Sequence, residues 1–137
     1  MNVSTLMKRS VVVVSPEDTV RRALEMLEDL EIRHLPVVVD GDTLVGIVSD
    51  RDLREFRLPV LEELAHPEFA DALMARKVGD AMNAQPVLME EHEGMGRAID
   101  LMIAHGIGAI PVVAKDSRAL VGIISYVDVL AAVRSSF

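Results

Sequence analysis

The sequence contains no cysteine and no tryptophan, and aromatic residues make up only 3% of its 137 residues. Without cysteine, the chain has no disulfide, no thiolate nucleophile and no thiolate metal ligand. Basic residues are a minority as well: 14 Lys and Arg stand against 22 Asp and Glu, which gives a formal net charge of −8. This charge disfavours nucleic acid as a partner, because binding to the phosphate backbone relies on basic patches.

Long hydrophobic runs are also missing. No apolar stretch approaches the length needed to span a bilayer, and the N-terminal residues 1–7 lack the apolar core of a signal peptide. Hydrophobic residues nevertheless make up 50% of the chain, so Val, Leu, Ile, Ala and Met supply its core. We therefore expect a soluble cytoplasmic protein with no membrane association, formed by one domain or by two small repeats that share a core.

One ten-residue stretch occurs twice. Residues 44–53 read LVGIVSDRDL, and residues 120–129 read LVGIISYVDV. Each copy begins with a β-branched apolar run of the kind found in buried strands. Each then has Ser followed by Asp three positions on, which is typical of a helix start capped by the hydroxyl. Each copy thus predicts a strand that turns directly into a helix with a carboxylate in its first turn.

The rest of the chain repeats at nearly the same offset. The matching segments are 3–7 and 78–82, 11–14 and 86–89, the helical apolar face at 20–27 and at 95–102, and 32–38 and 107–113. Each half therefore predicts the order strand, helix, strand, turn, strand, helix. We expect a first repeat over residues 1–53, a helical insert over 54–77 that packs on the core, and a second repeat over 78–137. One repeat alone is too small to bury its own apolar faces, so the two halves must pair.

These motifs resemble the tandem cystathionine-β-synthase (CBS) domain pair, also called a Bateman module, over almost the whole chain. The resemblance implies an α+β fold in which two tandem β-α-β-β-α repeats pack through their sheets as a pseudo-two-fold pair. It also implies a non-catalytic regulatory module with no obligatory cofactor. Its clefts would bind an adenosine-containing ligand: AMP, ADP, ATP, S-adenosylmethionine or NAD.

The same resemblance implies two clefts, each built from both halves. The first would combine Ser125 and Asp128 with Ser10, Val11, Val12, Arg33, His34, Leu35 and Pro36. The second would combine Ser49, Arg51 and Asp52 with Gln85, Pro86, Val87, Gly108, Ala109, Ile110 and Pro111. An Asp in the first turn of a helix is favoured by the helix dipole, and its oxygens can accept from the two hydroxyls of a ribose.

The two clefts differ in charge. Arg33 and His34 would give the first cleft cationic contacts to phosphate, whereas their counterparts Gly108 and Ala109 would give none. Arg51 stands beside Asp52, where the other copy has Val127. A cation in the first helical turn opposes the dipole, so Arg51 indicates a partner such as a ligand phosphate.

Two other interpretations remain open. A Ser-x-x-Asp motif is often only a capping device, so the chain can be a ligand-free structural or dimerisation module that docks a partner through its acidic surface and its insert. A nucleotide hydrolase using Asp52 or Asp128 with a metal would need a base or a metal cluster, and the sequence offers neither. The resemblance further implies a homodimer, a disc of four repeats, which signals to an effector protein.

Overall fold

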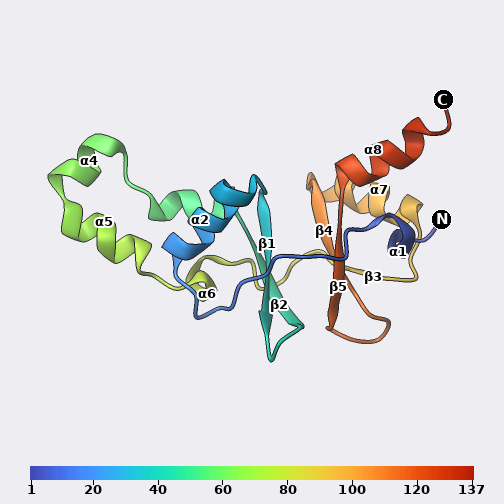
Figure 1. Ribbon diagram of the computed structural model, residues 1–137, viewed down its shortest axis with the longest axis horizontal. Coiled ribbons are helices and arrows are strands. Elements are labelled where there is room, and N and C mark those ends of the chain that lie inside the picture. Colours follow the sequence, from blue (N-terminus) through green and yellow to red (C-terminus); the bar gives the residue numbers. More distant parts are fainter. The chain divides into compact units, whose positions relative to one another are not determined.

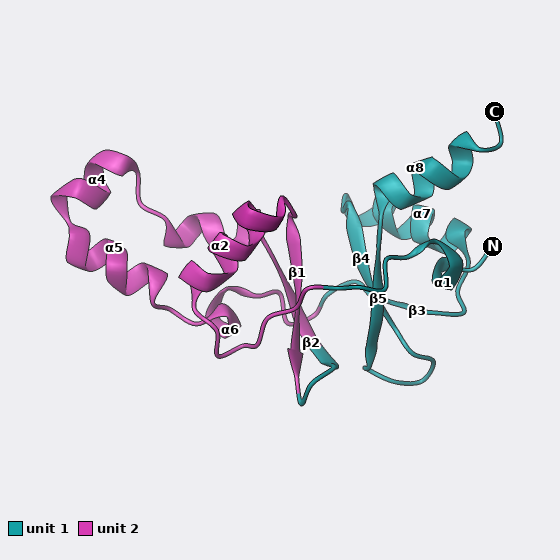
Figure 2. Ribbon diagram, viewed as in Figure 1, with its two compact units in different colours: residues 1–11, 40–44, 86–137 teal, residues 12–39, 45–85 magenta.

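The computed structural model describes residues 1–137, which form two compact units (Figure 2). Unit 1 contains residues 1–11, 40–44 and 86–137, and unit 2 contains residues 12–39 and 45–85. The boundaries do not follow the two sequence repeats, since the first eleven residues belong with the second repeat. No helix combines the length and the apolarity needed to cross a bilayer.

Unit 2 holds most of the first repeat, the insert and residues 78–85 of the second repeat (Figure 1). Its elements are α2 (Val20–Leu30), β1 (His34–Val39), β2 (Thr43–Ser49, of which the first two residues belong to unit 1), α3 (Asp50–Leu53), the 3-10 turn η1 (Arg54–Phe56), α4 (Val60–Ala65), α5 (Pro67–Met74) and α6 (Val78–Ala81). Helix α2 turns one apolar face toward the two-stranded sheet β1-β2. The core of this unit is formed by Val14, Val20, Ala23, Leu27, Leu35, Val37, Val48, Leu53 and Val78.

Unit 1 repeats this pattern with a three-stranded sheet, in the order β3-β4-β5. Its elements are α1 (Val3–Leu6), β3 (Met89–Glu90), α7 (Met95–His105), β4 (Ala109–Val113), β5 (Leu120–Ser125) and α8 (Tyr126–Arg134). Strand β4 pairs in parallel with β3 and antiparallel with β5. Its core is formed by Val3, Met7, Met89, Ala98, Ile110, Val112, Ile124 and Val129. The α+β class and the repeated order of elements are therefore confirmed.

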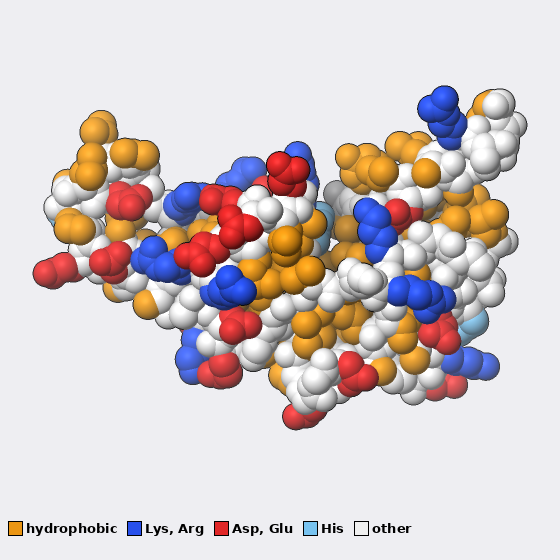
Figure 3. Space-filling model, viewed as in Figure 1, with side chains coloured by type: hydrophobic (Ala, Val, Ile, Leu, Met, Phe, Trp, Pro, Cys, Tyr) orange, Lys and Arg blue, Asp and Glu red, His pale blue; other side chains and the backbone are white.

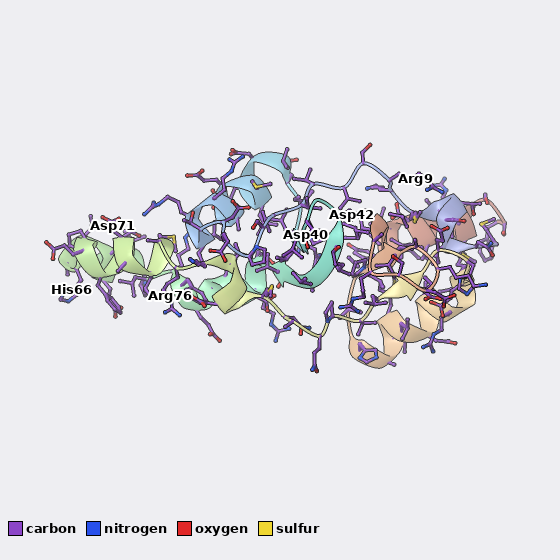
Figure 4. All side chains as sticks on the ribbon, turned by 90° about the horizontal axis from the view of Figure 1, so that it is seen from below. Arg9, Asp40, Asp42, His66, Asp71 and Arg76 are labelled. Carbon is purple, nitrogen blue, oxygen red and sulfur yellow. The ribbon has the colours of Figure 1, made fainter.

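The two units are built by the same local devices. Glu31 follows the last residue of α2 and Gly106 follows the last residue of α7, and both adopt the left-handed conformation, with φ of 54° and 62°. Between β1 and β2, Asp40 and Gly41 both have positive φ, of 51° and 89°. Asp-Gly with two positive φ angles is the favoured sequence of a two-residue hairpin turn, and Figure 4 labels Asp40 and Asp42 on this turn.

The first strand of each repeat is shorter than predicted. Of residues 11–14, only Val14 is paired: its N–H donates to the Pro36 carbonyl at 3.1 Å and its carbonyl accepts from Val38 N–H at 2.9 Å. In the second repeat, β3 contains only two residues. The chain before Val14 passes from one unit to the other, so it leaves the sheet of unit 2 after a single bridge.

The expectation that the whole insert packs on the core is wrong for α4. Ala70 of α5 is buried, and Phe56 and Met74 pack against the core of unit 2. Helix α4 has no buried residue, and its packing partner is α5. Its apolar side chains point to solvent, so the composition of the insert did not reveal which of its helices reaches the core.

Candidate functional site: the two capped strand-to-helix turns

Both Ser-x-x-Asp motifs form complete capping boxes. Ser49 Oγ accepts from the Asp52 N–H at 3.2 Å, while Asp52 Oδ2 accepts from the Ser49 N–H at 2.9 Å and from its hydroxyl at 3.0 Å. In the second repeat, the corresponding distances between Ser125 and Asp128 are 3.3, 2.8 and 3.0 Å. The reciprocal bonds satisfy backbone donors at the start of α3 and α8 and hold each carboxylate in one direction.

Each carboxylate still has an unused oxygen. Both hydrogen bonds that each carboxylate accepts end on Oδ2, and Oδ1 of Asp52 and of Asp128 has no hydrogen-bond partner. Both residues are half-buried, so neither oxygen is sealed in a core. A carboxylate can accept several hydrogen bonds. Capping and acceptance from a ligand hydroxyl are therefore compatible in the same residue.

In each unit, the chain entering β1 or β4 lies against the capped turn. The Asp50 N–H donates to the Arg33 carbonyl at 3.2 Å, and the Tyr126 N–H donates to the Gly108 carbonyl at 2.9 Å. In unit 1 the pairing of β4 with β5 also places Ala109 opposite Ser125. The segments 33–36 and 108–111 are thus neighbours of the capped turn in their own units.

His34 carries the resolved electrostatic shift of this region. Burial lowers the pKa of its imidazole, the carboxylates of Asp50 and Asp52 act in the opposite direction, and Arg33 acts in the same direction as burial. The net effect favours the neutral ring. At pH 7 the His34 imidazole is therefore neutral, and it can form hydrogen bonds close to the Asp52 carboxylate.

A cavity of about 340 Å³ opens beside the first capped turn, within unit 2. It is lined by Arg51, Asp52, Glu55, Phe56, Asp80 and Ala81. Asp80 is held by Arg76 at 3.1 Å, and the Arg76 guanidinium lies 5.7 Å from the centre of the Phe56 ring. Arg51 forms no salt bridge. The volume lies at the low end of the range of small-molecule sites, and Arg51 is a free cation at its wall.

The predicted cleft residues are divided between the units. For the first cleft, Ser10, Val11, Ser125 and Asp128 belong to unit 1, and Val12 and Arg33 to Pro36 belong to unit 2. For the second, Ser49, Arg51, Asp52 and Gln85 belong to unit 2, and Pro86, Val87 and Gly108 to Pro111 belong to unit 1. Leu35 and Ile110 are fully buried in the cores of their own units, so neither residue is exposed to a ligand in this structure. The assembly of each cleft from both halves stays a prediction.

Glu55, Phe56, Asp80 and Ala81 line this cavity but were not predicted as site residues. Glu55 and Phe56 follow Asp52 at the third and fourth positions, the spacing that shares a face in a helical stretch, so a sequence signal for them existed. Asp80 and Ala81 come from α6, 28 and 29 positions after Asp52 (80 − 52 and 81 − 52). No local pattern connects α6 with α3, so only the fold brings them together.

Comparison with known proteins identifies the class to which this fold and these turns belong. The sequence matches the CBS domain family twice, over residues 3–62 and 78–135. The chain therefore belongs to the CBS domain family and carries a tandem pair of these domains.

Individual relatives support the assignment. A CBS domain-containing protein of Dictyostelium discoideum is 33% identical over 129 residues, which cover 93% of this chain and 88% of that protein. The structure of CBSX2 from Arabidopsis thaliana superposes with a TM-score of 0.83 at 29% identity, covering 98% of this chain and 95% of that one. A CBSX2 structure in complex with AMP gives 0.81 at 30% identity, with 98% and 97% covered.

A third kind of relative is much longer. The inosine-5′-monophosphate dehydrogenase of Methanocaldococcus jannaschii is 34% identical over 122 residues, which cover 89% of this chain and 21% of that enzyme. This chain thus corresponds to about a fifth of the dehydrogenase. The match concerns that part of the enzyme alone.

Proposed function

We propose that this chain is a non-catalytic regulatory module that binds an adenosine-containing ligand, with AMP as the first candidate. The observation that carries the proposal is the pair of capped turns, in which Asp52 and Asp128 each keep one carboxylate oxygen free. Ribose presents two neighbouring hydroxyl donors that suit such an oxygen. CBSX2, which resembles this chain at 30% identity, has been solved with AMP.

The proposal extends to how the ligand is held. The ribose lies on Asp52 or Asp128, the adenine lies against the aliphatic edges of segments 10–12 and 85–87, and the phosphate meets Arg51 in one cleft or Arg33 and His34 in the other. Arg51 and Arg33 are exposed and form no salt bridge. Each is therefore available to a phosphate. Repeats 1–53 and 78–137 supply one capped turn each.

Calorimetric titration tests the proposal with AMP, ADP, ATP, S-adenosylmethionine and NAD, preceded by thermal shift. A ligand present at 100 times its Kd stabilises the fold by about 2.7 kcal/mol, which for a domain of this size is on the order of 10 °C in Tm. Asp52→Asn and Asp128→Asn are the informative variants. Asparagine retains a side-chain oxygen for the cap and removes the charge that favours hydroxyl donors.

We expect saturable binding of AMP that weakens at least tenfold in one or both Asn variants and is unchanged in Asp100→Asn, whose carboxylate is exposed on α7. Absence of saturable binding for all five compounds would leave the ligand-free docking module as the better function. Turnover of a nucleotide would instead support the hydrolase, which the proposal excludes.

Regulation needs a receiver, since ligand binding changes an equilibrium only through its different affinities for two states. In the M. jannaschii dehydrogenase, the segment that resembles this chain is part of an enzyme. We propose that here the receiver is an effector protein, and that two copies of the chain form a homodimer. Sedimentation equilibrium measures the latter directly.

A further inference from the structure

The insert exposes an apolar surface that the proposed nucleotide function does not use. Val60, Leu61 and Leu64 of α4 are 71%, 80% and 74% exposed, and Phe69 of α5 is 57% exposed. At about 100° per residue, the three α4 side chains fall within an arc of about 100° on one side of the helix. Figure 3 shows hydrophobic atoms gathered over the α4 end of the molecule, at the upper left.

Helix α4 is too short to be stable by itself. It has six residues and buries none of them, whereas isolated helices shorter than about 12 residues are marginal in water. Three large apolar side chains on such a helix are costly to keep in solvent. The surface therefore fits an interaction site better than a solvated end of the fold.

The charge on this surface has one sign. Between Arg57 and Arg76 there is no Lys or Arg, but there are four carboxylates, those of Glu62, Glu63, Glu68 and Asp71. Asp71 is paired with Arg21 of α2 at 3.3 Å, and the other three form no salt bridge. Figure 4 labels His66, at the junction of α4 and α5, and Asp71 on α5. The apolar side chains are thus rimmed by uncompensated negative charge.

A cavity of about 110 Å³ adjoins the surface, lined on its apolar side by Phe56, Leu58, Ala70 and Met74, with Glu63 also at its wall. Its two arginines are already engaged, Arg21 by Asp71 and Arg57 by Glu28 at 3.2 Å. Half of its eight lining residues are charged, and the four apolar ones leave room for one aliphatic side chain of a partner.

We propose that the α4–α5 hairpin docks a partner protein through a basic amphipathic helix, whose aliphatic face covers Val60, Leu61 and Leu64 and whose Lys or Arg side chains meet the three free glutamates. A second copy of this surface fits poorly, because it would bring the same unpaired glutamates, Glu62, Glu63 and Glu68, to the contact. An anionic membrane surface is repelled for the same reason. Opposite charge around an apolar centre is the arrangement that gives a helical partner both affinity and specificity.

The docking surface gives the effector protein of the proposed function a place to bind, but its test uses no nucleotide, so the two proposals fail separately. The probe is an 18-residue amphipathic Leu/Lys peptide labelled for fluorescence anisotropy. Two peptides serve as controls, one with the same composition in scrambled order and one with Glu in place of Lys. The protein variants are Leu61→Ser/Leu64→Ser, which keeps the net charge, and Ile103→Ser on α7, where Ile103 is 76% exposed.

We expect the wild-type protein to bind the Leu/Lys peptide at least tenfold more tightly than either control peptide. The Leu61→Ser/Leu64→Ser variant should bind the Leu/Lys peptide tenfold more weakly than the Ile103→Ser variant does. Affinity should also fall as salt increases from 50 to 300 mM, because the rim contacts are ionic. Equal binding of the scrambled peptide, or unchanged binding by the double variant, would overturn the proposal. The proposal would also be overturned if the wild-type protein did not bind the peptide and the double variant lost self-association. A second copy of the chain would then be the occupant of this surface.

Discussion

At the residue scale, the most informative feature is that one side chain performs two tasks through two different atoms. Oδ2 of Asp52 and of Asp128 closes a capping box, and Oδ1 is left without a partner. Loss of the cap costs about 1 kcal/mol. An Ala variant at either position would remove the cap and the ligand contact together, so its effect could not be assigned to either one. The Asn variants separate the two, because they keep an oxygen acceptor.

His34 gives a pH dependence whose direction follows from its surroundings. Burial lowers its pKa below 6.5 in the folded state, against the opposing fields of Asp50 and Asp52. Between the folded and the unfolded pKa, the unfolded chain binds more protons, so the free energy of unfolding rises with pH in that interval. The stabilising contribution of His34 is fully present above the pKa of the unfolded state, and it is lost as the pH falls through the pKa of the folded state.

The predicted result is that acidification from pH 7 to pH 5 destabilises the wild-type protein more than it destabilises His34→Gln. Urea unfolding at several pH values measures the difference, and His105→Gln, at the exposed end of α7, is the matched control. An identical pH profile for wild type and His34→Gln would show that the folded state does not disfavour protonation of this ring.

At the element scale, the sequence predicted what is local and missed what depends on distant contacts. The capped starts of α3 and α8, the apolar faces of α2 and α7 and the turn before the last strand of the first repeat each depend on neighbouring residues. All are present, and the turn is formed by Asp40 and Gly41. The exposure of α4 depends on how separate segments pack. So does the presence of Asp80 and Ala81 in the lining of the cavity beside the first capped turn. A pattern within one segment cannot contain that information.

Gly46 of β2 and Gly122 of β5 illustrate such a distant contact. The backbone after α6 runs beside β2, where Ile47 and Asn83 exchange two hydrogen bonds of 3.1 and 2.8 Å. The backbone after α1 runs beside β5, where Lys8 and Ile123 do the same at 2.9 and 3.0 Å. A Cβ at Gly46 would lie 2.8 Å from both the Asn83 carbonyl oxygen and Met82 Sδ. Glycine in a strand interior commonly marks such a close backbone approach.

We therefore predict that Gly46→Ala lowers the free energy of unfolding by about 1–3 kcal/mol, as overpacking does. The matched control is Gly96→Ala in α7, where a Cβ would meet nothing within 4 Å. That substitution should stabilise the protein by up to about 1 kcal/mol, since alanine favours the helix. Chemical denaturation measures the change in the free energy of unfolding for both variants, which should be a decrease for Gly46→Ala and an increase for Gly96→Ala. A neutral or stabilising Gly46→Ala would mean that Asn83 and Met82 move aside at little cost.

At the scale of the whole molecule, each compact unit takes its short leading helix from the other repeat's sequence. Val3 of α1 is fully buried in the core of unit 1 with residues of the second repeat, and Val78 of α6 is fully buried in the core of unit 2 with residues of the first. This exchange explains why the division into units differs from the repeats read along the sequence. It also gives the chain a reason to fold as a pair, because each core lacks a fully buried valine without the other repeat.

The proposed homodimer is the last property to be tested, and α8 is the element that points to it. Tyr126, Val127 and Leu130 are 56%, 53% and 59% exposed on this helix, at spacings that place them on neighbouring parts of one side.

We predict that the 15.0 kDa chain sediments with twice that mass and that Leu130→Glu converts it to a monomer. An unpaired carboxylate in an apolar interface costs several kcal/mol, and about 3 kcal/mol already raises a Kd more than a hundredfold. Leu61→Glu, on α4 outside this face, should retain the dimer mass. A monomeric wild type at 100 μM would refute the homodimer, and a dimer that survives Leu130→Glu would move the interface away from α8.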